Sequence, residues 1–166
     1  MPPSSKRFIL QSYELGSFDS NFCLKPPLML WVVLLYLARA FVIPFISGVS
    51  SMGGSGDASA ATRGYFSVED FVSSALALIV LVTYFRRTPT ASELWRRLWG
   101  YGRIILAAAA VVDLGVSAFR FSQVAGSEQW HAQLLLLACC VDAYILVYLF
   151  RSRRVRDVFN DFPSPQ

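Results

Sequence analysis

The stretch LYLARAFVIP (Leu35 to Pro44) places an arginine inside a long apolar run, and this combination constrains how the chain can fold. The run covers residues 28–48, and a helix of roughly 20 apolar residues crosses a hydrocarbon core about 30 Å thick. An arginine at the centre of such a helix costs about 2.5–3.5 kcal/mol on insertion scales. We therefore expect Arg39 to face other helices that carry groups able to bind it.

Three further apolar stretches follow, and together the four predict an all-α fold, an integral membrane four-helix bundle. The chain of 166 residues is 55% hydrophobic and only 16% charged. Its mean hydropathy of +0.47 is too high for a soluble domain, and its length suits a single transmembrane domain over 1–166. The expected spans are 28–48, 68–85, 98–119 and 130–150.

A signal peptide is the competing interpretation of the first span, because Ala58-Ser59-Ala60 resembles a cleavage site. However, the apolar run is longer than the hydrophobic region of a signal peptide, and the mixed segment 1–27 precedes it. The candidate cleavage site also lies well beyond the end of the run. We expect the first span to be retained as a membrane helix.

Basic residues gather on one side of the predicted topology. With both termini in the cytoplasm (N-in/C-in), only Arg63 and Arg120 fall on the outer side, as the positive-inside rule requires. The net charge of +4 therefore reflects membrane orientation, and no nucleic acid is expected as a partner. The inner side carries Lys6, Arg7, Lys25, Arg86, Arg87, Arg96, Arg97, Arg103, Arg151, Arg153, Arg154 and Arg156.

Arginines next to the inner membrane surface attract anionic lipid headgroups. The expected contacts with anionic lipids or a partner are Arg96, Arg97, Arg151, Arg153, Arg154 and Arg156. Pro44 is expected to kink or loosen the last turn of the first span. The segment RSRRVRDVFNDFP (151–163) is expected to continue the fourth helix into the cytoplasm, where Phe159 and Phe162 are candidates to rest on the membrane or a partner.

Two carboxylates in later helices lie at a depth similar to that of Arg39. At 1.5 Å per residue, Asp142 lies about 12 Å, Arg39 about 16 Å and Asp113 about 21 Å from the inner boundary. The five donors of a guanidinium can bridge two carboxylates, and small residues flank both aspartates. We predict an intramembrane polar cluster of Arg39, Asp113 and Asp142, with Tyr36 one turn away as a further hydrogen-bonding group.

Such a cluster has two interpretations. It either fixes helix packing or docks a partner, or it marks a proton or substrate path. No span shows the paired Gly/Pro interruptions of discontinuous transporter helices, and four helices enclose little space. The leading hypothesis is an accessory or scaffolding component of a larger membrane assembly. The alternative is a small oligomeric proton-coupled transporter or channel that uses Asp113 and Asp142, with Arg39 as their counter-ion.

Enzyme chemistry has little support in the sequence. His131 is the single histidine, and it falls in a predicted loop without a nucleophile context. The cysteines Cys23, Cys139 and Cys140 form neither a CxxC pair nor a cluster with histidine. Phosphate-binding and dinucleotide fingerprints are absent. We expect no enzymatic activity, no catalytic residue, no metal and no cofactor.

Three motifs carry a family resemblance. LKPPLMLWVVLLYLAR (24–39), WRRLW (95–99) and RSRRVRDVFNDFP (151–163) resemble the YfeZ-like family of small bacterial inner-membrane proteins of unknown function. The resemblance spans nearly the whole chain and implies a four-helix, multi-pass protein of the bacterial inner (cytoplasmic) membrane. It maps the arginine of the first helix onto Arg39 and supplies no activity. The expected partners are the lipid bilayer, anionic lipids, and other membrane proteins or a second copy of the chain.

Overall fold

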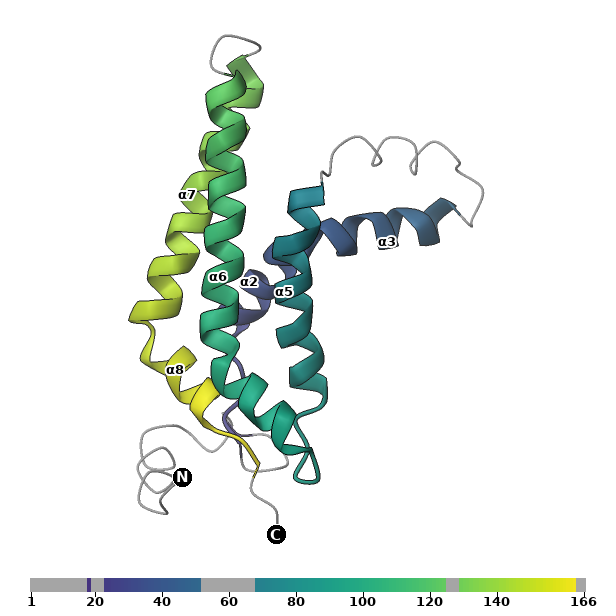
Figure 1. Cartoon of the computed structure of the whole chain (residues 1–166), viewed down its shortest axis with the longest axis vertical. Coiled ribbons are helices and arrows are strands. Elements are labelled where there is room, and N and C mark those ends of the chain that lie inside the picture. The colour runs from purple at the N-terminus through teal and green to yellow at the C-terminus, as the bar shows by residue number, and fades with distance from the viewer. Residues whose placement is uncertain (1–17, 19–22, 52–67, 125–128, 164–166) are drawn as a thin grey trace.

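A computed structural model describes residue 18 and residues 23–51, 68–124 and 129–163 (Figure 1). The described residues form helices and no β-strand, which confirms the predicted all-α class. Lys6, Arg7, Arg63 and the Ala58–Ala60 stretch lie outside them. The helices are α2 (Leu28–Leu37), α3 (Arg39–Ser51), α5 (Val68–Phe85), α6 (Glu93–Val124), α7 (Gln129–Arg151) and α8 (Arg153–Asn160).

Three helices, α5, α6 and α7, are long and apolar enough to cross a membrane. The bounds of α5 coincide with the predicted span 68–85, and α6 and α7 contain the predicted spans 98–119 and 130–150. The chain is therefore compatible with a membrane protein. Within the described residues, a fourth span exists only if α2 and α3 count as the two parts of one crossing.

The centre of the fold is α6, which packs against α5 on one side and α7 on the other (Figure 1). Small side chains dominate the buried faces of α5 and α6, so the two backbones can approach closely, as interhelical packing in lipid requires. On α5 the buried residues are Asp70, Ser73, Ser74, Ala77, Val80 and Thr83. On α6 they include Leu106, Ala107, Ala109, Ala110, Asp113 and Ser117.

The first predicted span is not a continuous helix. The axes of α2 and α3 differ by 78°, and the break lies at Ala38, which caps α2. Pro44 lies within α3, which continues past it to Ser51, so the break in the first span is not at the proline. Figure 1 shows α3 leaving the bundle sideways, past the beginning of α5. The predicted span 28–48 is thus two helices that meet at Arg39.

The fourth helix does not continue into the C-terminal segment, contrary to expectation. It ends at Arg151, and the Ser152 hydroxyl accepts a hydrogen bond from the Val155 backbone N–H at 3.3 Å, which caps α8. The short helix folds back onto α6 and buries Val155, Val158 and Phe159. Phe159 therefore rests on α6 of its own chain.

Gly102 makes this docking possible. The Phe159 ring lies against Gly102 and packs on Trp99, with the two ring centroids 4.8 Å apart. The Trp99 indole N–H also donates to the Val158 carbonyl at 2.9 Å. A Cβ atom at Gly102 would lie 2.8 Å from Cδ1 of Phe159, closer than real Cβ contacts allow.

We expect Gly102→Ala to displace α8 from α6. The matched control is Gly100→Ala, because nothing lies within 4 Å of a Cβ at that position. Replacing glycine by alanine favours a helix by about 1 kcal/mol, so the control should be neutral or stabilising. Limited trypsin digestion in detergent should cleave after Arg153 or Arg156 several-fold faster in Gly102→Ala alone. Equal cleavage rates in the two variants would contradict the predicted docking.

Candidate functional site

The break between α2 and α3 releases helix carbonyls that need donors from elsewhere, since hydrocarbon offers no water. Ser74 on α5 supplies one, and its hydroxyl donates to the Leu37 carbonyl at 2.7 Å. Arg39 supplies another, and its Nη1 donates to the Tyr36 carbonyl at 3.2 Å. The break is thus held by two side chains, one from each of the helices α3 and α5.

Arg39 also forms a two-pronged ion pair with Asp113 on α6. The distances are 2.7 Å from Nη1 to Oδ2 and 3.0 Å from Nη2 to Oδ1, the fork geometry that gives the strongest arginine–carboxylate pairs. The Ser73 hydroxyl lies 3.5 Å from Oδ1, and the guanidinium carbon lies 4.5 Å from the centroid of the Tyr36 ring. Asp113 is 2% exposed, so its charge is neutralised within the protein.

Asp142 on α7 lies beside this pair but does not join its hydrogen bonds. The residue is fully buried, and neither carboxylate oxygen accepts a hydrogen bond from any residue that the structure describes. Asp113, Arg39 and Tyr36 are close enough to act on it electrostatically. The structure therefore brings the four predicted residues together, with Arg39 bound to Asp113 and without the predicted bridge to Asp142.

The break site, as we call Tyr36, Arg39, Ser73, Ser74, Asp113 and Asp142, contains two carboxyl groups and one guanidinium. Its hydrogen bonds fix the helix break and pair one carboxylate with Arg39, and the second carboxyl group, that of Asp142, lies outside this pair. No group of three or more His, Cys, Asp or Glu side chains suited to a metal ion occurs in the part of the chain that the structure describes.

A second ion pair with a buried carboxylate links the N-terminal end of α5 to the C-terminal part of α6. Arg120 Nη2 donates to Asp70 Oδ2 at 2.8 Å, and Asp70 is buried. This pair was not predicted from the sequence. A sequence signal existed, since Arg120 is the one arginine near the C-terminal end of α6.

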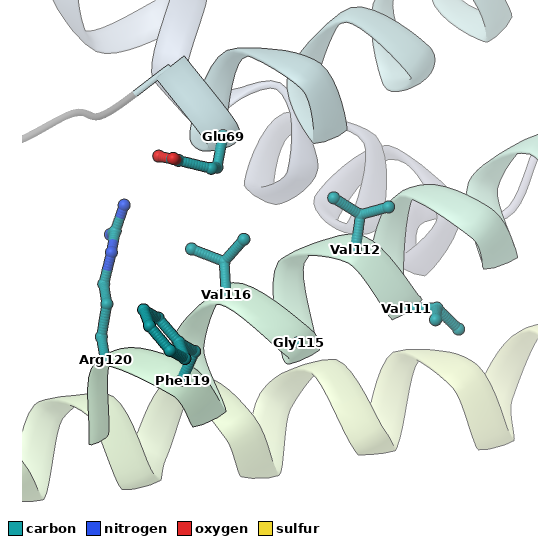
Figure 2. A pocket seen from close by; sticks show the side chains of 7 residues that line it. All are labelled: Glu69, Val111, Val112, Gly115, Val116, Phe119 and Arg120. Atoms are coloured by element: carbon teal, nitrogen blue, oxygen red, sulfur yellow. The ribbon is translucent and has the colours of Figure 1, made fainter. Parts of the chain in front are cut away.

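A groove of about 400 Å³ opens next to this pair, along the surface of α6. Figure 2 shows Val112 and Val116 pointing into it, with Glu69 and Arg120 at one end. Gly115 lies on its floor, where a Cβ would meet open space. The groove is mostly apolar, so it suits a hydrocarbon chain or an apolar helix more than a polar solute.

The end of the fold that holds α8, which we call the basic end, has its own network around Arg87 and Asp161. Arg87 donates to the carbonyls of Leu24 and Asp161, and its Nη2 lies 3.8 Å from Asp161 Oδ2. The same carboxylate accepts the Leu24 backbone N–H at 2.8 Å. This network ties the segment just before α2, the α5–α6 loop and the C-terminal segment together, and sequence reasoning missed it.

The predicted lipid-contacting arginines also lie at the basic end. Arg96, Arg97, Arg151, Arg153 and Arg156 are exposed, and Arg154 is half-buried. Arg97 pairs with Glu93 at 2.6 Å on the surface, and the Arg96 guanidinium lies over the Phe162 ring at 5.5 Å. These contacts hold the two side chains near α6 and leave both exposed to solvent or to a membrane surface.

Comparison with known proteins yields one family. A family model described as "Protein of unknown function (DUF2919)" matches residues 13–161 of the chain, which include every residue of the break site. Neither the curated proteins nor the solved structures contain a significant match to the chain.

We expect Arg39→Gln to destabilise the fold by about 3–5 kcal/mol, because it leaves the buried carboxylate of Asp113 without its cation. The double variant Arg39→Gln/Asp113→Asn should recover part of this loss, because it removes both charges. The control is Arg97→Gln, which breaks an exposed pair and should change stability little. Unfolding in mixed detergent micelles measures all three. A double variant less stable than Arg39→Gln would contradict a dominant role of the ion pair.

Proposed function

The chain belongs to the DUF2919 family of proteins of unknown function, and we propose that it is a multi-pass membrane protein that acts as an accessory or scaffolding component of a larger membrane assembly. The proposal places it in the bacterial inner membrane, with both termini in the cytoplasm, and gives it no enzymatic activity. The observation that carries the proposal is the direction of α3.

The apolar helix α3 leads away from the bundle and exposes large side chains. Its axis turns 78° from that of α2, and Phe45 is 73% exposed. Phe41 stays at the bundle, where its ring meets that of Phe71 with centroids 5.2 Å apart. At 1.5 Å per residue the 13 residues of α3 are about 20 Å long. A helix of this kind can dock on the transmembrane helix of another protein.

The ion pairs support a structural role as well. Arg39–Asp113, Asp70–Arg120 and Arg87–Asp161 each link segments far apart in the sequence, and each carboxylate in them is buried. Pairs of this kind hold one arrangement of helices, because separating the partners would leave a buried charge without compensation. A framework fixed in this way suits a protein that positions partners, and the groove at Gly115 is a second apolar surface for one of them.

The exposed arginines of the basic end fit a contact with anionic lipids. Each lysine or arginine next to an anionic surface contributes about 1 kcal/mol of attraction. Five exposed arginines from α6, α7 and α8 therefore favour an orientation in which the basic end faces the cytoplasmic leaflet: Arg96, Arg97, Arg151, Arg153 and Arg156.

A photocrosslinking amino acid at Phe45 tests the scaffold. We expect it to form an adduct with one membrane protein that also co-purifies in stoichiometric amount in mild detergent, as mass spectrometry would show. The matched control is the same probe at Val147, an exposed position on α7 that should meet lipid. Lipid adducts alone at both positions, without a co-purifying partner, would rule out the scaffold. Adducts with a second copy of the chain would indicate a homo-oligomer instead.

One observation favours the second candidate, a small oligomeric proton-coupled transporter that uses Asp113 and Asp142. It is the carboxyl group of Asp142, buried in the bundle without a hydrogen-bond partner among the described residues. Ionisable groups at such positions in membranes often lie on proton paths. The break in the first span adds to this candidate, since transporters bind coupling ions at discontinuous helices.

Proteoliposomes distinguish the transporter from the scaffold. The transporter predicts that the wild-type protein dissipates an imposed pH gradient at least several-fold faster than protein-free vesicles, and that Asp142→Asn abolishes the difference because it cannot carry the proton. Asp157→Asn serves as the control, since Asp157 lies on α8 outside the three long helices. Equal rates for wild-type and empty vesicles would exclude proton transport through the reconstituted protein.

A further inference from the structure

The buried carboxyl group of Asp142 is the one part of the break site that helix packing does not explain. Buried polar side chains in proteins almost always have hydrogen-bond partners, and a buried charge without one is strongly unfavourable. Asp142 is fully buried, yet both of its oxygens lack a partner among the described residues. A residue retained only for packing would satisfy its polar atoms or would be apolar.

The charges around Asp142 indicate which ligand would satisfy it. From α2 it faces Tyr36, from α3 Arg39 and from α6 Asp113, while Cys139 lies one turn away on α7 itself. Arg39 is the one cation among these groups, and both of its terminal nitrogens are bonded to Asp113. With both aspartates ionised, the site would carry one uncompensated negative charge, so one added positive charge makes it neutral.

A proton fits this requirement better than a metal ion. A metal cation needs several oxygen ligands arranged around it, and the described residues form no cluster of three or more metal-binding side chains. A proton needs one oxygen and no space. The resulting carboxylic acid also becomes a donor, with the Asp113 carboxylate and the Tyr36 hydroxyl as neighbouring acceptors.

We propose that Asp142 is a proton-binding site: its buried carboxyl group holds one exchangeable proton, and when the proton leaves, the Asp142 carboxylate competes with Asp113 for the Arg39 guanidinium at the helix break. The proton passes from the carboxyl group to water as the site opens, and no other bond is broken. Because Arg39 also binds the Tyr36 carbonyl, this competition acts directly on the junction of α2 and α3.

The site needs only an exchangeable proton, so it is independent of the scaffold role and of net proton transport. A scaffold could use it to respond to pH, and a transporter could use it as a step of its path. Failure to find a protein partner, or failure to find flux, leaves the proton site in place, and loss of the proton site leaves the scaffold in place.

Infrared difference spectroscopy of the full-length protein in lipid nanodiscs tests the proposal. Exposed carboxyl groups titrate near pH 4, at about the values of model peptides, so a protonated-acid carbonyl band at neutral pH reports a buried acid. We expect the wild-type protein to show one such band, which shifts in heavy water and disappears as the pH is raised. Asp142→Asn should lack the band. Asp113→Asn should also weaken or lose it, because Arg39 is then free to compensate an ionised Asp142 carboxylate. Asp157→Asn, on α8, should retain it.

Asp142→Glu covers the case in which Asp142→Asn fails to fold, since it keeps an acid and should move the band without removing it. A wild-type spectrum without an acid band at neutral pH would overturn the proposal, and so would a band that ignores both heavy water and pH. A band that is unchanged in both Asp142→Asn and Asp142→Glu would assign the proton to another residue and overturn it as well.

Discussion

The ion pair between Arg39 and Asp113 is the interaction on which the rest of this structure depends. It brings the end of the first apolar helix onto α6, and the same guanidinium binds the Tyr36 carbonyl that the helix break sets free. In hydrocarbon a broken helix is stable only if its carbonyls find other donors. Arg39 therefore allows the break and neutralises the buried charge with one side chain, and α3 takes its sideways course from that point.

The bends at Ala38 and at Ser152 have the same cause: nearby side chains bind the backbone groups that the end of a helix leaves without partners. At the break, the Ser74 hydroxyl supplies the donor for the Leu37 carbonyl. At the basic end, Ser152 caps α8, and Trp99 donates to the Val158 carbonyl once that helix has folded back. Gly102 has no side chain, and this leaves the space on α6 that the Phe159 ring occupies. At both places polar side chains bind backbone groups where the chain changes direction, from a neighbouring helix in the case of Ser74 and Trp99 and from the cap position of α8 in the case of Ser152.

The sequence predicted those features that a single segment of the chain determines. The spans 68–85, 98–119 and 130–150 follow from apolar runs, because length and composition alone decide whether a helix can cross a membrane. The approach of Arg39 to an aspartate follows from comparing depths along the helices. The break at Ala38 could not be predicted, because no glycine or proline marks it and the group that stabilises it, Ser74, belongs to another helix. The pairs Asp70–Arg120 and Arg87–Asp161 likewise need the tertiary fold to bring them together.

The geometry of the break also explains why the carboxyl group that Arg39 does not bind is the one on α7. A guanidinium could bridge two carboxylates, but Arg39 has both terminal nitrogens on Asp113 and one of them on the Tyr36 carbonyl, so Asp142 is left out. The helix that carries Asp142 is the least buried of the three long helices, and its main packing partner is α6. A helix held mainly on one side can move more easily than α6, which is packed on both. A change in the charge of Asp142, or a partner that covers α7, would therefore act on the break through the contact between Asp142 and the Arg39–Asp113 pair.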